Sequence, residues 1–239
     1  MCQPPPIPIR RVVIGSHNQK KKQELMALLG TLPIEVRTLA DYPQALRVEE
    51  VGQSFAENAA LKASCQAVHL GEWVVADDSG LCVDALGGEP GVHSAYFAGP
   101  LATDEENNDL LLERLADVPD EQRSAFYVCH IALADPTGAI RLTCEERCYG
   151  RITRVRRGSA GFGYDPLFEI VEYRKTFGEL GEPAKSLLSH RGRAVRQFVR
   201  KLRRLAMIDA LRQPAIVPPG TTVSPATDLQ PAKPSVTAR

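Results

Sequence analysis

Two adjacent aspartates follow an apolar run at residues 73–80 (WVVADDSG). The run is rich in β-branched residues, which predicts a strand that ends at Asp77 and Asp78 and delivers them to the rim of a sheet. Carboxylates in that position can hold a metal ion or a water nucleophile. Because consecutive strand residues point to opposite faces, we expect the two aspartates to have different roles. The alternative is a capped turn in which Asp and Ser bond nearby backbone amides.

A basic cluster, residues 15–22 (GSHNQKKK), lies between a predicted strand and a predicted helix. Lysines at a helix N-terminus are unfavourable, by roughly 0.3–1 kcal/mol each, because the helix dipole is positive there. A bound anion reverses that sign, since helix amides, hydroxyls and ammonium groups would then converge on a phosphate. The spacing of glycine and lysine is not that of a P-loop. A solvated turn whose lysines extend into water is the alternative.

Two glutamates, Glu49 and Glu50, precede Val51 and Gly52. Proteins bind Mg²⁺ with few carboxylates, and the ion keeps several waters while substrate phosphate completes its shell. One Asp and one Glu from separate loops are therefore enough for a site, and Asp78 with Glu49 is the candidate pair. The two glutamates fit a solvated loop equally well.

Two further clusters lie in the second half of the chain. Residues 161–166 (GFGYDP) place glycines on both sides of an aromatic ring, which lets the backbone approach a ligand and offers a stacking surface for a base. A glycine-rich turn with Phe162 in the core is the alternative. Residues 185–193 (KSLLSHRGR) enter a final helix, with Ser189 as the expected N-cap. His190 and Arg191 then supply donors that suit an anion or a carbonyl-bearing base.

Composition limits the possible functions. Of 239 residues, 44% are hydrophobic and 24% charged, which is typical of one ordinary domain with tails. Lys plus Arg equals Asp plus Glu at 29 each, so no global field recruits nucleic acid or a membrane. No apolar run approaches the ~18 residues of a membrane span, and the N-terminus lacks the apolar core of a signal peptide. Six scattered cysteines favour reduced thiols in a cytoplasmic protein, and no structural metal is expected.

Three segments are expected along the chain: a disordered Pro-rich leader at 1–9, a folded domain at 10–212, and a disordered tail at 213–239. The expected strands are 11–15, 35–39, the run before Asp77, and a pair at 124–134 and 139–148. The expected helices are one that ends at Gly30, two that open with capping boxes at Ser54 and Thr103, and a basic one over 189–211. The mixture indicates an α/β domain whose sheet is not purely parallel.

Five motifs occur in order between about Arg11 and Leu205. They are Ser16-x-Asn18-x-x-Lys21-x-x-Glu24, Phe55-x-Glu57-Asn58-Ala59-x-x-Lys62-Ala63, Ala76-Asp77-Asp78-Ser79-Gly80-Leu81, Gly161-Phe162-Gly163-Tyr164-Asp165-Pro166 and Ser189-His190-Arg191-Gly192. Each motif alone is weak, but the ordered set is specific. The chain resembles the inosine/xanthosine triphosphate pyrophosphatase family, which removes deaminated purine nucleotides from the precursor pool.

This resemblance implies an elongated mixed β-sheet flanked by helices in two lobes, with the active site in the cleft, and a homodimer. It implies Mg²⁺-dependent hydrolysis of ITP, dITP and XTP to the monophosphate and pyrophosphate, which keeps these nucleotides out of DNA and RNA. Asp78 would be the general base and, with Glu49, a magnesium ligand; an unperturbed Asp is already ionised at neutral pH. The residues expected at the phosphates are Ser16, His17, Asn18, Gln19, Lys20, Lys21 and Ser79. Those expected at the base are Phe162, Gly163, Tyr164, Asp165, Lys185, His190 and Arg191.

Selectivity for deaminated purines then follows from hydrogen bonding. Hypoxanthine and xanthine carry an acceptor oxygen at C6, whereas adenine carries an amino donor. Donors from His190 and Arg191 pair with the oxygen and are left unpaired against the amine, which can be worth several orders of magnitude. Guanine keeps the oxygen, so its exclusion must come from the 2-amino edge.

The chain departs from the family pattern in the phosphate loop, where His17 replaces a usual Gly and Gln19 and Lys20 add bulk and charge. Three alternative functions remain. A pyrophosphatase for pyrimidine or modified nucleotides is disfavoured by the aromatic loop and the His190–Arg191 pair. A non-catalytic nucleotide binder is disfavoured by the intact Asp78, Glu49 and Lys21. A nucleic-acid binder, suggested by the basic final helix, is disfavoured by the zero net charge.

Overall fold

A single seven-stranded sheet organises residues 9–212, which are the residues that the computed structural model describes. The strand order is β2-β1-β3-β4-β5-β6-β7. Strand β1 pairs in parallel with β2 and β3, and the later pairings are antiparallel, which confirms the predicted mixed sheet. The strands are β1 (Arg11–Ile14), β2 (Glu35–Thr38), β3 (Val74–Val83), β4 (Ser124–Ala134), β5 (Ile140–Ile152), β6 (Phe168–Ile170) and β7 (Lys175–Thr176).

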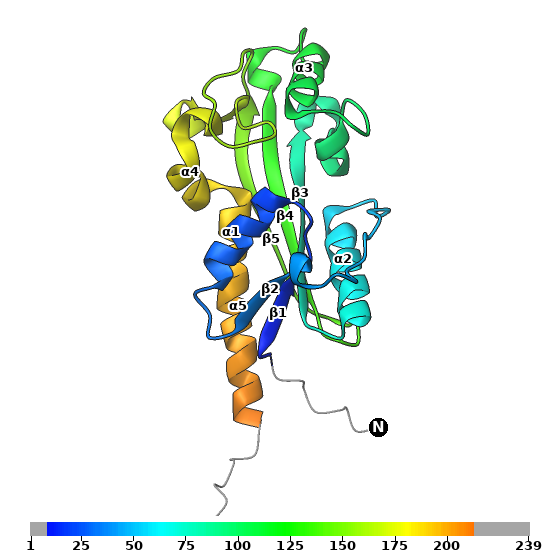
Figure 1. The fold of residues 1–239 in the computed structure, drawn as a ribbon. Coiled ribbons are helices and arrows are strands. Elements are labelled where there is room, and N and C mark those ends of the chain that lie inside the picture. Colours follow the sequence, from blue (N-terminus) through cyan, green and yellow to red (C-terminus); the bar gives the residue numbers. More distant parts are fainter. Residues whose placement is uncertain (1–8, 213–239) are drawn as a thin grey trace, which may run out of the picture.

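The molecule is elongated and has two lobes, because β3, β4 and β5 run along most of its length (Figure 1). The lower lobe holds β1, β2, α1, α2 and most of α5, and the upper lobe holds α3 and α4. The helices are α1 (Gln19–Leu29), α2 (Phe55–Leu70), α3 (Asp104–Arg114), α4 (Phe177–Leu188) and α5 (His190–Arg212). Short 3₁₀ turns are η1 (Leu39–Asp41), η2 (Asp84–Leu86), η3 (Gly91–Tyr96), η4 (Asp120–Gln122) and η5 (Val171–Tyr173).

Strand β3 is longer than the sequence predicts. We expected it to end at the two aspartates, and that expectation is wrong. Strand β4 pairs with β3 along its whole length, from Val74 opposite Ala134 to Val83 opposite Ala125, and this ladder carries the strand through Asp and Gly residues that are poor strand formers. The aspartates therefore lie in the middle of a strand rather than at the rim of the sheet.

Local sequence signals correctly located most of the other elements. The Ser54 hydroxyl accepts a hydrogen bond from the Glu57 N–H at 3.2 Å and opens α2. Thr103 and Glu106 form a reciprocal capping box at α3. The Ser189 hydroxyl accepts from the Gly192 N–H at 3.1 Å at the start of α5. The antiparallel pair β4 and β5 and the helix that ends before Gly30 also lie where they were expected.

Helix α4 was not predicted, and neither were β6 and β7. Gly181 interrupts α4 with φ 75° and ψ 174°, and Pro183 follows, so the segment consists of two short helical pieces. Strands β6 and β7 have three and two residues, too few to show a period. These short elements complete the upper lobe and carry the chain to Lys185.

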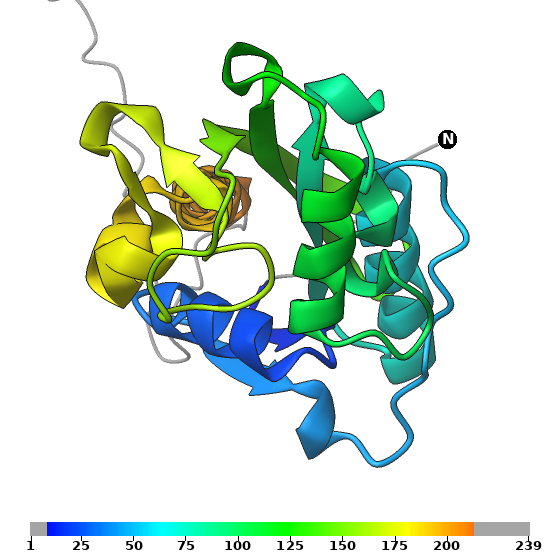
Figure 2. The ribbon, with the colours of Figure 1, turned by 90° about the horizontal axis from the view of Figure 1, so that it is seen from above.

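The core has three parts that reflect the two faces of the sheet. One lies between the sheet and helices α1 and α5 and includes Leu25, Phe198 and Ile131. A second lies under α2 and includes Ala63 and Ala132. The third fills the upper lobe beneath α3 and α4. Viewed from above, α5 lies on one side of the long strands and α2 and α3 lie on the other (Figure 2).

The predicted domain limits of 10–212 fall within the described residues. The leader at 1–9, apart from Ile9, and the tail at 213–239 lie outside them. None of the helices in residues 9–212 is long and apolar enough to cross a membrane.

Candidate active site

A cavity of about 490 Å³ is lined by residues of both lobes. It brings together four of the clusters singled out in the sequence, from the loop after β1, from β3, from the glycine-rich loop and from the start of α5. The predicted site residues that line it are Ser16, His17, Asn18, Lys21, Asp78, Ser79, Phe162, Gly163, Tyr164, Asp165, Lys185, His190 and Arg191. A pocket of this size accommodates a ligand of nucleotide dimensions.

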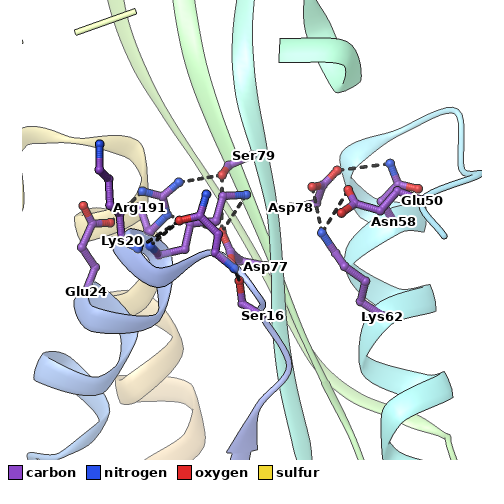
Figure 3. A network of polar contacts seen from close by, with 12 residues as sticks. Ser16, Lys20, Glu24, Glu50, Asn58, Lys62, Asp77, Asp78, Ser79 and Arg191 are labelled. Atoms are coloured by element: carbon purple, nitrogen blue, oxygen red, sulfur yellow. Dashed lines mark hydrogen bonds and ion pairs between the residues drawn. The ribbon is translucent and has the colours of Figure 1, made fainter. Parts of the chain in front are cut away.

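Asp77 points from β3 toward α1 and α5 (Figure 3). Its carboxylate lies 3.6 Å from the Lys21 ammonium and accepts from Arg191 Nε at 3.4 Å. Burial alone would raise the pKa of Asp77, but Lys21 and Arg191 more than offset burial and hold it well below the usual range. Asp77 is therefore a permanent anion that fixes two cations, and it is too weakly basic to accept a proton.

Asp78 points the other way, toward α2 (Figure 3). Its carboxylate accepts from Asn58 Nδ2 at 3.2 Å and from Lys62 Nζ at 3.0 Å. Lys62 is shared with Glu50, whose carboxylate lies 3.1 Å from the same ammonium. Burial raises the pKa of Asp78 to about 6, although Lys62 and Lys21 oppose the rise. This differs from the unperturbed carboxyl expected from the sequence, and it matches a general base that works near neutral pH.

The loop after β1 is ordered by its own side chains. Asn18 Oδ1 accepts from the backbone N–H groups of Lys20 and Lys21 at 3.0 and 3.1 Å and caps α1. The Ser16 hydroxyl accepts from the Asn18 N–H at 3.3 Å. His17 Nε2 donates to the Leu46 carbonyl at 3.0 Å, so its ring connects this loop to the loop that carries Glu50. The His17 side chain, which stands where the family usually has Gly, therefore contacts Leu46, a residue that is not a phosphate-binding candidate.

Three cationic groups surround the Phe162 ring. Lys185 Nζ lies 4.0 Å from the ring centroid, Lys20 Nζ lies 4.8 Å from it, and Arg191 Cζ lies 5.7 Å from it. These distances are within the range of cation–π attraction. Lys20 comes from α1, so this contact joins the phosphate-loop side of the cavity to the aromatic loop.

Asp165 organises the glycine-rich loop. Its Oδ2 accepts from the Phe162 N–H at 2.8 Å and from Lys185 Nζ at 2.5 Å. Burial raises the pKa of Asp165, and Lys185 opposes that rise. Gly161 has φ 83°, and a Cβ there would lie 2.0 Å from Asp165 Oδ2, so only glycine fits. Tyr164 is buried and donates its hydroxyl to the Ser94 carbonyl at 2.9 Å.

His190 stacks on Tyr127, with ring centroids 4.7 Å apart and planes 9° from parallel. Burial, together with Arg191 and Lys185, lowers the pKa of His190 well below its usual value, so the imidazole is neutral. Its Nδ1 has no hydrogen-bond partner within the part of the chain that the structure describes. A neutral ring provides one N–H donor and one acceptor, which suits a base edge better than a phosphate.

The donors of Arg191 are largely committed to the protein. Besides Asp77, the guanidinium donates to Glu24 at 2.7 Å and to the Ser79 hydroxyl at 2.8 Å. The sequence interpretation directed Arg191 to the base, whereas the structure places it at the Asp77 side of the cavity with its Cζ near Phe162.

Known proteins are similar to this chain in sequence and in fold. The model of the Ham1 family matches residues 12–201. The chain belongs to the Ham1 family. A dITP/XTP pyrophosphatase of Rhodopirellula baltica is 51% identical over 194 residues, which cover 81% of this chain and 93% of the relative. A dITP/XTP pyrophosphatase of Bacillus cereus is 43% identical over 195 residues, which cover 81% and 95%.

Solved structures of Ham1 proteins share the fold. A HAM1 protein from Coxiella burnetii superimposes with a TM-score of 0.76 at 38% identity, covering 81% of this chain and 98% of that one. A dITP/XTP pyrophosphatase from Mycobacterium abscessus superimposes with a TM-score of 0.67 at 42% identity, covering 79% and 98%. These matches confirm the predicted family and the predicted α/β architecture.

In this Ham1 protein, three predicted site residues do not line the cavity: Gln19, Lys20 and Glu49. Both glutamates are exposed, but only Glu50 lines the cavity. The segment has no regular structure, so no periodicity in the sequence could say which of two adjacent glutamates faces inward. Glu50 rather than Glu49 shares Lys62 with Asp78.

Sequence reasoning assigned no role to several residues that build the Ham1 site. Asn58 and Lys62 are four residues apart on α2 and so share the face that meets Asp78. Both belong to the second motif of the resemblance, and their helical spacing was the available signal. Glu24, which holds Arg191, also stands in a motif. Tyr127 lies in a strand without a signal that separates it from core aromatics.

The donor set on the Asp78 side fits a magnesium ion. Two carboxylates, Asp78 and Glu50, flank the single ammonium group of Lys62. Residues 9–212 contain no group of three or more His, Cys, Asp or Glu side chains suited to a metal. An ion held here would keep waters and phosphate oxygens in its shell, as Mg²⁺ does and a fully protein-caged metal does not.

Proposed function

We propose that the protein hydrolyses the deaminated purine nucleotides ITP, dITP and XTP to the monophosphate and pyrophosphate, which keeps them out of DNA and RNA. The observation that supports this most is the single cavity that joins a cationic loop, a carboxylate with a pKa of about 6 and an aromatic loop with neutral His190. The dITP/XTP pyrophosphatase relatives support the same activity.

The two ends of the cavity suit the two ends of a nucleotide. Ser16, Asn18 and Lys21 line the cavity at the start of α1, where the positive end of the helix dipole and an ammonium group favour phosphate. Phe162, Lys185 and His190 form the aromatic end, which favours a purine. Asp78 lines the cavity between these sets in the long strand β3.

In the mechanism that we propose, Asp78 accepts a proton from water. The water oxygen forms a bond to the α-phosphorus, and the bond from that phosphorus to the oxygen bridging to the β-phosphate breaks. Pyrophosphate leaves, and the proton passes from Asp78 to solvent. Asn58 and Lys62 orient the carboxylate of Asp78, while Lys21, whose ammonium group lies 3.6 Å from Asp77, lines the cavity and would also contact phosphate oxygens.

We propose that Asp78 and Glu50 hold Mg²⁺. The ion would supply positive charge against the phosphate oxygens. Glu50 and Asp78 both pair with the single ammonium group of Lys62. A cation held by the two carboxylates would take over the attraction that this ammonium group now supplies.

Discrimination at the base rests on hydrogen bonding. The neutral imidazole of His190 carries one N–H that can donate to the C6 oxygen of hypoxanthine or xanthine. Its Tyr127 neighbour fixes the ring plane. Adenine presents a donor at C6, so its binding leaves this N–H unpaired in a buried site, a mismatch that can cost orders of magnitude in rate.

We infer that two copies associate into a homodimer. The β5 side chain Tyr149 is 66% exposed, packs against Phe126 of β4 with centroids 5.8 Å apart, and lies beside Arg147, whose Cζ is 4.9 Å from the Phe126 ring. An exposed tyrosine on a half-buried phenylalanine, with an arginine beside them, is the composition typical of an interface. Light scattering of the wild type and of Tyr149→Asp would show a dimer mass and its loss.

We propose that the enzyme acts in the cytoplasm, where nucleoside triphosphates are pooled. The thiols of Cys65, Cys82, Cys129, Cys144 and Cys148 are free, which supports a reducing compartment.

Pyrophosphate release from dITP, XTP, dATP and dGTP, with and without Mg²⁺, tests the proposed function. We expect metal-dependent turnover of dITP and XTP at least ~100-fold above that of dATP. Equal turnover of all four would remove the selectivity argument and keep the pyrophosphatase. Tight dITP binding without turnover would indicate a nucleotide-binding protein instead.

A further inference from the structure

Two side chains of α3 bind both polar backbone groups of Gly163. Asp104 Oδ2 accepts from the Gly163 N–H at 2.8 Å, and Asn108 Nδ2 donates to the Gly163 carbonyl at 2.9 Å. Asp104 and Asn108 are four residues apart, so they lie on the same face of the helix. Neither residue belongs to the five motifs of the sequence, and both act on a loop more than fifty residues away.

The geometry fixes the orientation of the Asn108 amide. Its nitrogen has two carbonyl partners, Asp104 O at 2.6 Å and Gly163 O at 2.9 Å, and a carbonyl can only accept. The Oδ1 of Asn108 is left buried without a hydrogen-bond partner among the described residues, and the residue is 2% exposed. Such an oxygen lowers stability. The contact to Gly163 is thus retained at the expense of an unsatisfied acceptor.

These contacts complete the fixation of the backbone beside Phe162. The Phe162 N–H donates to Asp165 Oδ2 at 2.8 Å, and the Phe162 carbonyl accepts from the Asp165 N–H at 3.3 Å. With Asp104 and Asn108, all four polar backbone groups of residues 162 and 163 are bonded. Gly163 has φ 61°. Without these contacts a glycine could adopt many other backbone conformations. The position of the Phe162 ring is therefore set in part from α3.

We propose that Asp104 and Asn108 are positioning residues that hold Phe162 where a purine stacks on it. This inference rests on the proposed function. Asp78, Lys62 and Lys21 lie on β3, α2 and α1, so the α3 contacts act on recognition of the base and leave the phosphoanhydride chemistry unchanged. Loosening the loop then weakens binding of any ligand that carries the purine and has no effect on a ligand that consists of phosphate alone.

Asp104→Ala and Asn108→Ala, with Glu105→Ala as control, test this proposal. Glu105 is in the same turn and carries the same charge, but its side chain makes no hydrogen bond or ion pair within residues 9–212; outside the helix, only its backbone carbonyl is bonded, to Arg156. We expect each α3 variant to raise the KM for dITP and the Kd for dIMP, measured by calorimetry, about tenfold, the cost of one such hydrogen bond. The kcat and the inhibition constant of pyrophosphate should stay within about twofold of wild type. Asp104→Asn keeps an acceptor and should restore most of the dIMP affinity.

Several outcomes would overturn the proposal. Unchanged dIMP affinity in Asp104→Ala is one, and a loss of kcat or of pyrophosphate affinity equal to the loss of dIMP affinity is another. Asp104 is exposed, so its variants provide the test if Asn108→Ala does not fold. Failure of the proposed function appears separately, as a wild type that does not turn over dITP, and the calorimetric comparison with dIMP still decides the role of α3.

Discussion

The two faces of β3 carry the same residue type in adjacent positions and give it opposite properties. Asp77 faces Lys21 and Arg191, and its pKa is held well below the usual range, against the effect of burial. Asp78 faces one cation, Lys62, which it shares with Glu50, and burial raises its pKa to about 6. Both aspartates are almost fully buried, at 1% and 4% exposure.

The difference shows that the balance of neighbouring charges, more than burial, assigns the roles. Two cations against one carboxylate make Asp77 a fixed counter-ion. One cation between two carboxylates leaves Asp78 able to exchange a proton near neutral pH. The alternation of side chains along a strand separates these environments by a single residue. The predictions below change one face at a time.

The largest effect is expected at the Asp78 face. Asp78→Asn keeps the shape and the contact to Lys62 but cannot accept a proton, so kcat for dITP should fall by about 10³-fold. Pyrophosphate release measures this, and calorimetry with dIMP should show binding close to that of wild type. Turnover that survives the substitution would remove Asp78 from the mechanism.

Asp77→Asn is expected to act on stability first. It leaves Arg191 and Lys21 without their shared buried anion, and breaking a buried ion pair in this way costs about 3 kcal/mol. Urea unfolding at pH 7.5 measures the loss. The matched variant Asp78→Asn should lose less free energy of unfolding, because burial disfavours the charge that it removes. An equal loss in both variants would contradict the proposed division between the two faces.

A smaller effect is expected in the pH dependence of kcat/KM, which reports on the Asp78 face. The raised pKa means that Asp78 is protonated below about pH 6, so kcat/KM should fall about tenfold per pH unit on that side and level off above it. Lys62→Met removes a cation that lowers the pKa, and the acidic limb should move to higher pH. A limb that stays in place in Lys62→Met would assign it to another group.

The sequence predicted the helices and strands that depend on local signals better than those that depend on contacts between distant segments. Capping residues such as Thr103 and Ser189 act locally, so the helices that they open were visible. The continuation of β3 through Asp77 and Gly80 depends on its pairing with β4, in which Asp77 lies opposite Ile131 and Gly80 opposite Val128, and propensity does not reveal such a distant partner. Helix α4 is interrupted at Gly181, and its conformation is set by packing in the upper lobe.

The candidate site shows the same limit. The chemical types were evident, and most of the predicted residues line one cavity. The choice between Glu49 and Glu50 depends on the course of an irregular loop that His17 and Gln66 attach through Leu46. The commitment of Arg191 to Glu24 and Asp77 depends on how α1, β3 and α5 pack together.

The lobes of this protein are joined by β3, β4 and β5, and these strands cross from one lobe to the other without a loop (Figure 1). Hinge motions in enzymes concentrate rotation in a few loop or terminal residues. Here any widening of the cleft has to bend a ladder of paired strands, so the resistance is elastic and is distributed over many hydrogen bonds. Mechanically, the paired strands set the stiffness of the cavity that the two lobes line.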